Sequence, residues 1–383
     1  MYEHKVDWNH KIFHHKMTSI NQLNESHMQK KVRIIDIAKM AGVSKGTVDR
    51  VLHNRGNVSE AARIAIERVL EKVNYRPNIH VSAISLKKSY KIIVTTPEAS
   101  LGAYWESIHN GIRHALKEYE NVKIELQVFT YNQYDIYSCR EIFEKIAGFE
   151  MDALIIGPTF PEETINLCKK MDDRNIPYVF VDSFIESTAP LAFFSADHYV
   201  CGYMMAKLIT SIIPPQTNIA IFQAVRTGDK SANTTVLRKK GFTDYLEKNR
   251  CSNLVLSIPF SITEPESNEM YLSRLFSSQK EIPAIVVLNS RGNFIANYLD
   301  TNHISGVRMI CMDLTSANVE ALKKGQIDYL IGQEPEYQGF SSMKTLLEYL
   351  IFKSPVKKQN YVQLDIITRE NVGFYKRFNN TVY

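Results

Sequence analysis

The run from Ser44 to Asn54 combines basic and polar side chains with apolar ones at helical spacing. If Val48, Val51 and Leu52 form the inward side of one helix, the outward side holds the groups able to hydrogen-bond: Lys45, Gly46, Asp49, Arg50 and His53. Ser44, Lys45 and Gly46 stand at the helix N-terminus, which is the end of a recognition helix that touches base edges. The chemistry that this pattern predicts is hydrogen bonding to the bases and phosphates of duplex DNA.

Three helices are needed to position that face. An apolar stripe predicts the first one: Ile34, Ile37, Ala38 and Ala41. Gly42 supplies the left-handed residue that a helix-turn-helix corner needs. Ser44 is the expected N-cap of the second helix, and Ser59 with Glu60 opens the third. The third helix has its own apolar stripe: Ala62, Ile66, Val69, Leu70 and Val73. Tyr75-Arg76-Pro77 ends it, because the residue before a proline disfavours helix.

This stretch resembles the DNA-binding headpiece of the LacI/GalR (lac repressor) family. The resemblance is carried by DIAKMAGVSKGTVDRVLHN at 36–54, Val58-Ser59, and NYRPN at 74–78. It implies that Lys45, Gly46 and Arg50 read bases, and that Thr47, Ser59 and Asn78 touch or face phosphates and the minor groove. The expected DNA-binding set is Ser44, Lys45, Gly46, Thr47, Asp49, Arg50, His53, Asn54, Ser59, Asn78 and Ile84.

Asp49 departs from the family pattern, which usually has serine before the arginine of the recognition helix. Its carboxylate can accept a hydrogen bond from cytosine N4 or pair with Arg50. The operator sequence therefore stays open. The alternative interpretation of the whole stretch is a three-helix bundle unrelated to DNA.

Basic charge is concentrated around this stretch. Residues 28–90 hold thirteen Lys and Arg against five Asp and Glu, an excess of +8, whereas the whole chain carries only +5. The remaining residues therefore sum to about −3. A small basic region in an otherwise slightly acidic chain indicates a polyanionic partner.

The other compositional signals are weaker. Residues 1–27 are polar and without period, so we expect a disordered leader with Met28 as the working start. His10, His14 and His15 could hold a metal if helical, but they lack an acidic or cysteine partner, and we expect no metal and no cofactor. Five scattered cysteines predict reduced, mostly buried thiols. No apolar run reaches the roughly 18 residues of a membrane span and no signal peptide is evident, so a cytoplasmic, nucleoid-associated protein is expected.

Residues 79–90 connect the headpiece, 28–78, to the rest of the chain. By the same resemblance they form a hinge helix that folds on operator DNA and wedges an apolar side chain into the minor groove. Ile84 occupies the expected leucine position, and Val81 replaces the usual alanine. An apolar wedge between base steps is still possible with isoleucine. A plain linker is the alternative.

From Lys91 the pattern becomes short apolar strands alternating with helices. Strands are predicted at 92–95, 124–129, 153–156 and 178–181, and the pattern repeats from 219 to 331. Such alternation predicts parallel sheets covered on both faces, and two sets predict two α/β lobes with a ligand cleft at the strand ends. This architecture resembles the type I periplasmic-binding-protein fold. We expect it at 91–383, with chain crossings near 194–197, 332–335 and Pro355.

The second resemblance implies a ligand-binding set whose members lie at strand ends or at the start of the first helix, except for Arg238, which stands three residues before Gly241. The set is Tyr104, Trp105, Asp182, Arg238, Asn289, Asp313 and Gln333. The aromatic pair would stack on a sugar ring, and the polar groups would bond its hydroxyls. Arg226, Asp229 and Glu98 are weaker candidates. The alternative for any single residue is structural, since an Asp after a strand is most often a helix cap.

Together these patterns predict an α/β protein with a helix-turn-helix headpiece and a two-lobed effector domain. The expected function is a ligand-responsive transcription regulator, a repressor that binds a palindromic operator as a homodimer or dimer of dimers. Its effector would be a monosaccharide or sugar derivative. Alternatives are a purine or other solute acting as corepressor, or a sugar-binding protein without regulatory role. No nucleophile elbow or phosphate-binding loop occurs, so an enzyme is not expected. The tail at 369–383 lacks leucine heptads, which disfavours a coiled coil.

Overall fold

The computed structural model describes residues 34–52, 58–72, 88–224, 227–228, 233–261, 265–278 and 284–375. The chain divides into two compact units, Met1–Ser82 and Ala83–Tyr383, and each is described by itself. Within the described ranges, no helix combines the length and the apolarity needed to cross a membrane.

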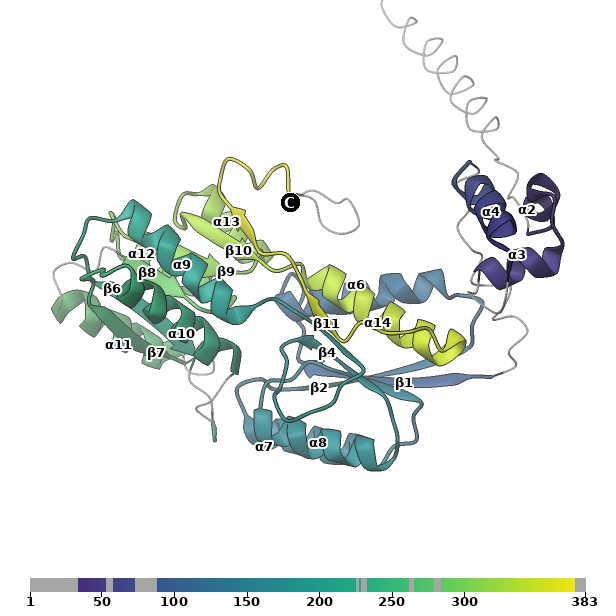
Figure 1. Ribbon diagram of the computed structural model, residues 1–383. Helices are drawn as coiled ribbons and strands as arrows, with labels where there is room; N and C mark the ends of the chain where they lie inside the picture. The colour runs from purple at the N-terminus through teal and green to yellow at the C-terminus, as the bar shows by residue number, and fades with distance from the viewer. Residues whose placement is uncertain are drawn as a thin grey trace, which may run out of the picture. The chain divides into compact units, whose positions relative to one another are not determined.

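In the first unit the described residues form three helices, α2 (Ile34–Ala41), α3 (Lys45–Leu52) and α4 (Glu60–Lys72) (Figure 1). Its core is the cluster of Ile37, Ala38, Val48 and Ile66. Gly42 turns the chain with φ +66°, a conformation that glycine adopts without strain. Ser44 then caps α3, because its Oγ accepts the Thr47 amide hydrogen at 3.1 Å. The predicted helix-turn-helix is confirmed.

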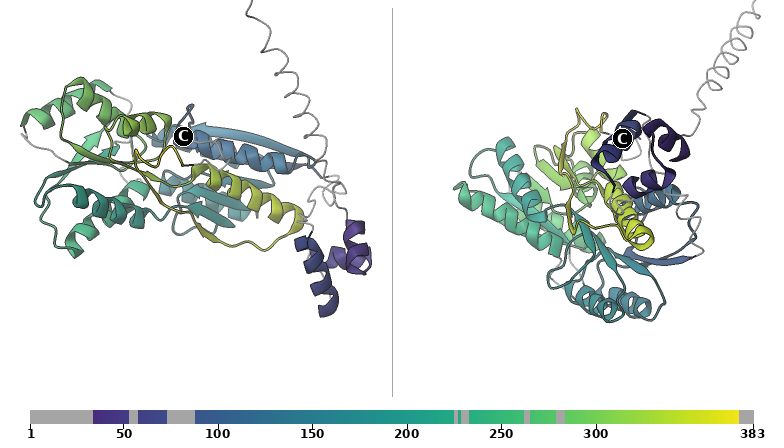
Figure 2. Two further views of the ribbon diagram at one scale, coloured as in Figure 1. Left: turned by 90° about the horizontal axis from the view of Figure 1, so that it is seen from above. Right: turned by 45° about the vertical axis from the view of Figure 1, so that its right-hand side comes forward.

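The second unit consists of two lobes, each with a six-stranded sheet. The first sheet is parallel throughout and has the order β11-β5-β4-β3-β1-β2. Its strands are β1 (Tyr90–Pro97), β2 (Ile124–Tyr131), β3 (Ala153–Ile156), β4 (Tyr178–Asp182), β5 (Ala192–Ser195) and β11 (Gln359–Tyr361). Its helices are α6 (Tyr104–Glu118), α7 (Ile136–Ala147), α8 (Pro161–Asp173) and α14 (Pro335–Phe352). The α6–α14 pair covers one face and the α7–α8 pair the other (Figures 1 and 2).

The second sheet has the order β12-β10-β9-β8-β6-β7, which repeats that of the first. Its strands are β6 (Ile219–Ala224), β7 (Val255–Phe260), β8 (Ala284–Val287), β9 (Arg308–Met312), β10 (Tyr329–Gly332) and β12 (Asp365–Ile367). Its helices are α9 (His198–Ile212), α10 (Asn233–Lys248), α11 (Pro265–Ser278), α12 (Gly292–Thr301) and α13 (Ser316–Lys323). Only β12 runs antiparallel to its neighbour among these described strands. The predicted pair of mainly parallel α/β lobes is confirmed.

The chain crosses between the lobes three times. The first crossing joins β5 to α9 and the second joins β10 to α14, as predicted near 194–197 and 332–335. The expected third crossing near Pro355 is wrong. After α14 the chain stays in the first lobe, because β11 pairs with β5, and it crosses only at 362–364 before β12. A strand of only three residues gives too short a pattern to be predicted from sequence.

Candidate functional site

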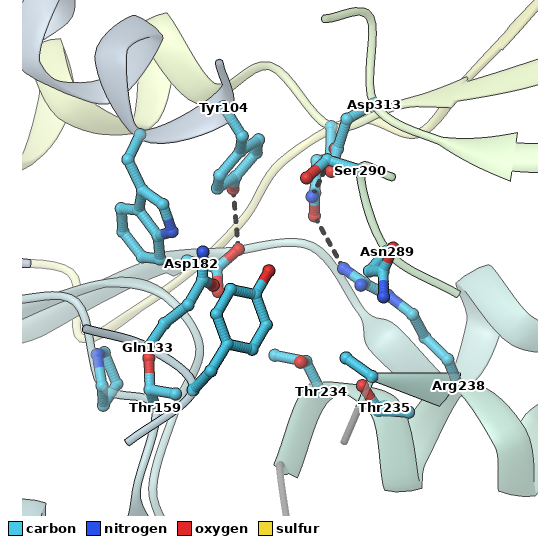
Figure 3. A pocket seen from close by; sticks show the side chains of 15 residues that line it. Tyr104, Gln133, Thr159, Asp182, Thr234, Thr235, Arg238, Asn289, Ser290 and Asp313 are labelled. Atoms are coloured by element: carbon cyan, nitrogen blue, oxygen red, sulfur yellow. Dashed lines mark hydrogen bonds between the residues drawn. The ribbon is translucent and has the colours of Figure 1, made fainter. Parts of the chain in front are cut away.

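A cleft lies between the lobes at the carboxyl ends of the parallel strands, where open α/β sheets bind ligands. It encloses about 670 Å³ of atom-free space, including its opening to solvent. The seven expected ligand residues all line it: Tyr104, Trp105, Asp182, Arg238, Asn289, Asp313 and Gln333. Residues not foreseen complete the lining (Figure 3): Gln133, Tyr134, Pro158, Thr159, Ala224, Thr234, Thr235 and Ser290.

The first lobe contributes a hydrogen-bonded pair to the cleft. Asp182 ends β4, and its Oδ1 accepts the Tyr104 hydroxyl at 2.7 Å (Figure 3). Burial and the neighbouring Asp182 carboxylate raise the pKa of Tyr104 well above its ordinary value. Trp105 lies edge-on to Tyr104, with ring centroids 5.4 Å apart. This wall therefore offers a carboxylate beside two aromatic rings.

The second lobe contributes three linked polar groups. Arg238 on α10 donates from Nη2 to Gln333 Oε1 at 3.2 Å, and Gln333 Nε2 donates to Asp313 Oδ1 at 2.7 Å. Burial raises the pKa of Asp313 to about 7, and the positive charge of Arg238 opposes this increase. Near neutral pH Asp313 is therefore present in both its protonated and its ionised form.

Asn289 and Ser290 follow β8 in a short turn. The Asn289 Oδ1 accepts the Arg291 amide hydrogen at 2.9 Å, so this oxygen shapes its own loop. Among the weaker candidates, Glu98 is exposed and is not part of the cleft lining. Arg226 and Asp229 lie outside the described residues.

On the first unit, α3 presents the expected DNA-facing residues. Ser44, Lys45, Gly46 and Arg50 are exposed, while Thr47 and Asp49 are half-buried. The Thr47 hydroxyl lies 2.8 Å from Ser44 Oγ, so both hydroxyls help to start the helix. Ser59 is exposed, and its Oγ accepts the Ala62 amide hydrogen at 3.4 Å.

Four expected DNA contacts lie outside the described residues: His53, Asn54, Asn78 and Ile84. The leader at 1–27 and most of the proposed hinge, Val81 included, also lie there. Their assignment stays a prediction.

Two buried residues at the floor of the cleft were missed in the sequence. His198 is the first residue of α9, and Gln338 lies in the first turn of α14. Both follow a chain crossing, and both bond to the backbone of Asp182. A lone His or Gln in an apolar helix gives no sequence signal, since most such side chains are ordinary core residues.

Comparison with known proteins agrees with this architecture. Residues 33–78 match the bacterial regulatory proteins of the lacI family, and residues 92–354 match the periplasmic binding protein domain. The chain therefore belongs to the lacI family of regulatory proteins, with a periplasmic-binding-protein domain as its larger part.

Three similar proteins illustrate the relationship. The HTH-type transcriptional regulator DegA of Bacillus subtilis is 26% identical over 57% of this chain and 61% of its own length. The ribose operon repressor of Halalkalibacterium halodurans is 26% identical over 61% of this chain and 65% of its own. The chain thus spans less than two thirds of these relatives. A crystal structure assigned as a LacI transcriptional regulator from Bacteroides fragilis has TM-score 0.72 and 29% identity, covering 75% of this chain and all of that one.

Proposed function

We propose that this protein is a transcription regulator that binds operator DNA through α3 and responds to a neutral sugar in the interlobe cleft. The observation that carries the proposal is the joint presence of a lacI-family headpiece and a polar, aromatic-walled cleft at the strand ends. A repressor acting as a homodimer on a near-palindromic site, in the cytoplasm, fits this assignment. The relatives named above are regulators, and the proposal gives the cleft no catalytic role.

The lining supports a sugar because it pairs hydrogen-bonding groups with aromatic surface. Carboxylates, amides and threonine hydroxyls supply both acceptors and donors, as a polyol requires. Tyr104 and Trp105 supply a wall that can cover the apolar face of a ring. The name of the ribose operon repressor supports the same ligand class.

The charge of the lining favours a neutral sugar over a sugar phosphate or sugar acid. Within the described ranges, Arg238 is the one cationic side chain that lines the cleft. Its guanidinium already donates to the Leu288 carbonyl at 2.9 Å and to Gln333. Asp182 and Asp313 stand on opposite walls of the cleft. An anionic ligand would therefore meet two acidic side chains, and the guanidinium of Arg238 already donates hydrogen bonds within the protein.

Thermal melting of the full chain against a ligand panel tests this proposal. The panel contains neutral pentoses and hexoses, their phosphates, sugar acids, polyols and purines. A ligand at about one hundred times its dissociation constant adds roughly 2.7 kcal/mol to the unit that binds it. We expect a neutral sugar to raise the melting temperature and Asp182→Ala to abolish the rise. A rise with purines or phosphates alone would refute the sugar assignment and leave the DNA-binding assignment standing.

The direction of the response follows from a second measurement on the same protein. Oligonucleotides selected from a random library provide the operator, and its affinity is measured with and without the sugar. We expect the sugar to weaken operator binding, as for an inducer. Tighter binding would instead identify a corepressor, because a ligand that favours the DNA-bound form must bind that form better.

A further inference from the structure

The floor of the cleft contains a closed ring of hydrogen bonds that spans both lobes. The Asp182 carbonyl lies 2.8 Å from His198 Nε2, and His198 Nδ1 lies 3.1 Å from Arg238 Nη2. Arg238 Nη2 donates to Gln333 Oε1 at 3.2 Å, and the Gln333 carbonyl accepts Gln338 Nε2 at 2.7 Å. The Asp182 amide closes the ring by donating to Gln338 Oε1 at 2.9 Å.

The chemistry of the partners fixes how His198 bonds. Arginine can only donate, so His198 Nδ1 must accept from Arg238, and Nε2 must carry the hydrogen that the Asp182 carbonyl accepts. Burial and the adjacent Arg238 lower the pKa of His198 well below its ordinary value, which keeps the His198 imidazole neutral. All five members are buried, with exposures of 8% or less, so each unmade bond would leave a polar atom without water.

The ring follows the chain crossings. Asp182 belongs to the first lobe and Arg238 to the second, and His198 joins them directly after the first crossing. Gln333 lies within the second crossing, and Gln338 joins it to Asp182 directly after that crossing. Gln338 Nε2 also lies 3.3 Å from the Tyr104 hydroxyl. Three residues that line the cleft are therefore held by two residues that do not line it.

We propose that His198 and Gln338 are positioning residues that tie the two walls of the cleft together, so that the arrangement of the lobes depends on this ring. A ligand that moves Asp182 or Arg238 would then act on both crossings at once. The inference goes beyond the proposed function. Only the statement about a ligand rests on the proposed function, because it assumes that the cleft binds one. Its test needs neither ligand nor DNA.

Among the backbone hydrogen bonds that join the lobes, two have their donor amide in the second lobe, and these report how the lobes are arranged. The Ser316 amide donates to the Gly102 carbonyl at 3.2 Å, and the Thr227 amide donates to the Tyr134 carbonyl at 2.7 Å. Hydrogen exchange of the full chain, followed by mass spectrometry, measures how often these bonds open. Amides inside one lobe, such as Ile219 bonded to Leu254, report unfolding of that lobe alone.

Gln338→Met keeps the side-chain length and removes the amide, which leaves ring members unpaired. We expect exchange at Ser316 and Thr227 to speed up by about ten-fold or more, with little change at Ile219. His198→Asn is too short to reach both partners and should act in the same direction. The matched control is Ser342→Ala, one turn further along α14, where an equally buried hydroxyl bonds only within its helix. Unchanged exchange at Ser316 and Thr227 in Gln338→Met would overturn the proposal.

Gln338→Glu separates a positioning role from simple loss of packing. A protonated glutamic acid can donate to the Gln333 carbonyl and accept from the Asp182 amide, whereas its carboxylate can only accept. Relative to the parent chain at each pH, exchange at Ser316 and Thr227 should be near normal at about pH 5 and fast at about pH 8. The parent comparison removes the effects of the titratable groups facing this position: Tyr104, Asp182, His198, Asp313, Glu334 and Glu336. If the ratio of the exchange rates at Ser316 and Thr227 in Gln338→Glu to those in the parent chain is the same at both pH values, the ring does not hold the lobes together.

Discussion

Asp182 and Asp313 occupy equivalent positions in the two lobes and share an unusual backbone conformation. Asp182 ends β4 with φ +71°, and Asp313 follows β9 with φ +69°, while β4 and β9 hold the same place in their sheets. A non-glycine residue with positive φ is uncommon and costs free energy. Both aspartates line the cleft, so in each lobe the strained backbone conformation lies at a polar residue of the cleft.

The pKa of Asp313 makes the stability of the ligand-free protein depend on pH. Its folded pKa of about 7 lies above the ordinary value of 3.8. Between these values the folded state keeps a proton that the unfolded state has lost, so this residue's contribution to stability declines as pH rises through the window. Each unit of pKa shift corresponds to about 1.4 kcal/mol.

Asp313→Asn should therefore become more stable relative to the parent chain as pH rises from about 5 to about 8, by up to a few kcal/mol. Urea denaturation of the larger unit at both pH values measures the difference. Asp300→Asn, at an exposed site on α12 of the same lobe, is the control and should show no such gain. A constant difference between Asp313→Asn and the parent would show that Asp313 is ionised throughout.

Lys45 is the residue for which the DNA-binding assignment makes its simplest prediction. It is exposed at the N-terminus of α3. Lys45→Ala should weaken operator binding, and if its charge neutralises one phosphate, the slope of log affinity against log salt should fall by about 1. Loss of discrimination at one base pair, with an unchanged slope, would instead indicate base reading. Arg68→Ala, on the exposed face of α4, tests whether any lost basic charge has the same effect.

At the scale of residues, the sequence was sufficient to place a side chain in the cleft where that side chain lies at the end of a predicted strand. The family resemblance placed Asp182, Asp313 and Gln333 in the cleft, and each of them lies at or just after the end of a parallel strand, where the strands meet one edge of the sheet. Gln133, Thr159 and Ser290 could not, because they sit in loops whose course depends on the packed lobes. That the cleft residues bind a ligand stays a prediction.

At the scale of elements, the helices that follow the first two crossings dock through glycine. A Cβ on Gly202 of α9 would lie 1.8 Å from the Arg238 carbonyl oxygen on α10. One on Gly339 of α14 would lie 2.0 Å from the Ile108 carbonyl oxygen on α6. These glycines allow the close helix contacts that bring His198 to Arg238 and Gln338 to Tyr104. The same device therefore recurs in both lobes.

Gly202→Ala and Gly339→Ala should each destabilise the larger unit, because backbone must move to admit the methyl group. We expect a loss of about 1–3 kcal/mol or more in urea denaturation. Gly148→Ala is the matched control, since its Cβ would meet the Lys145 carbonyl oxygen at an ordinary 3.6 Å. It should be neutral or slightly stabilising. Equal stability of all three variants would mean that the helix pairs can separate freely.

Helices α9 and α14 lie outside the segments for which the sequence pattern predicted strands and helices. α9 carries apolar residues on most of its sides and so lacks a clear stripe, and α14 contains a glycine, which lowers helix propensity. Their position is set by tertiary packing against α10 and α6, which no local pattern records. The missed His198 and Gln338 follow from these missed helices.

At the scale of the whole molecule, the separation of charge predicts that the two binding activities respond differently to salt. The +8 excess of residues 28–90 can release counterions from DNA, whereas Arg238 is the single cationic side chain that the described residues contribute to the lining of the cleft. A protein making six to ten phosphate contacts loses about 10³–10⁵ in affinity between about 50 and 200 mM salt. Binding of a neutral sugar should change little over the same range.

Titrations of one preparation with selected operator DNA and with the sugar that shifts its melting temperature, at several salt concentrations, measure both slopes. Lys45→Ala should weaken only DNA binding, and Asp182→Ala should abolish only sugar binding. A steep salt dependence of sugar binding would mean that the ligand is charged, which contradicts the neutral-sugar assignment. A flat dependence for DNA would mean that the basic headpiece does not contact phosphate, and the operator-binding proposal would fail on that result alone.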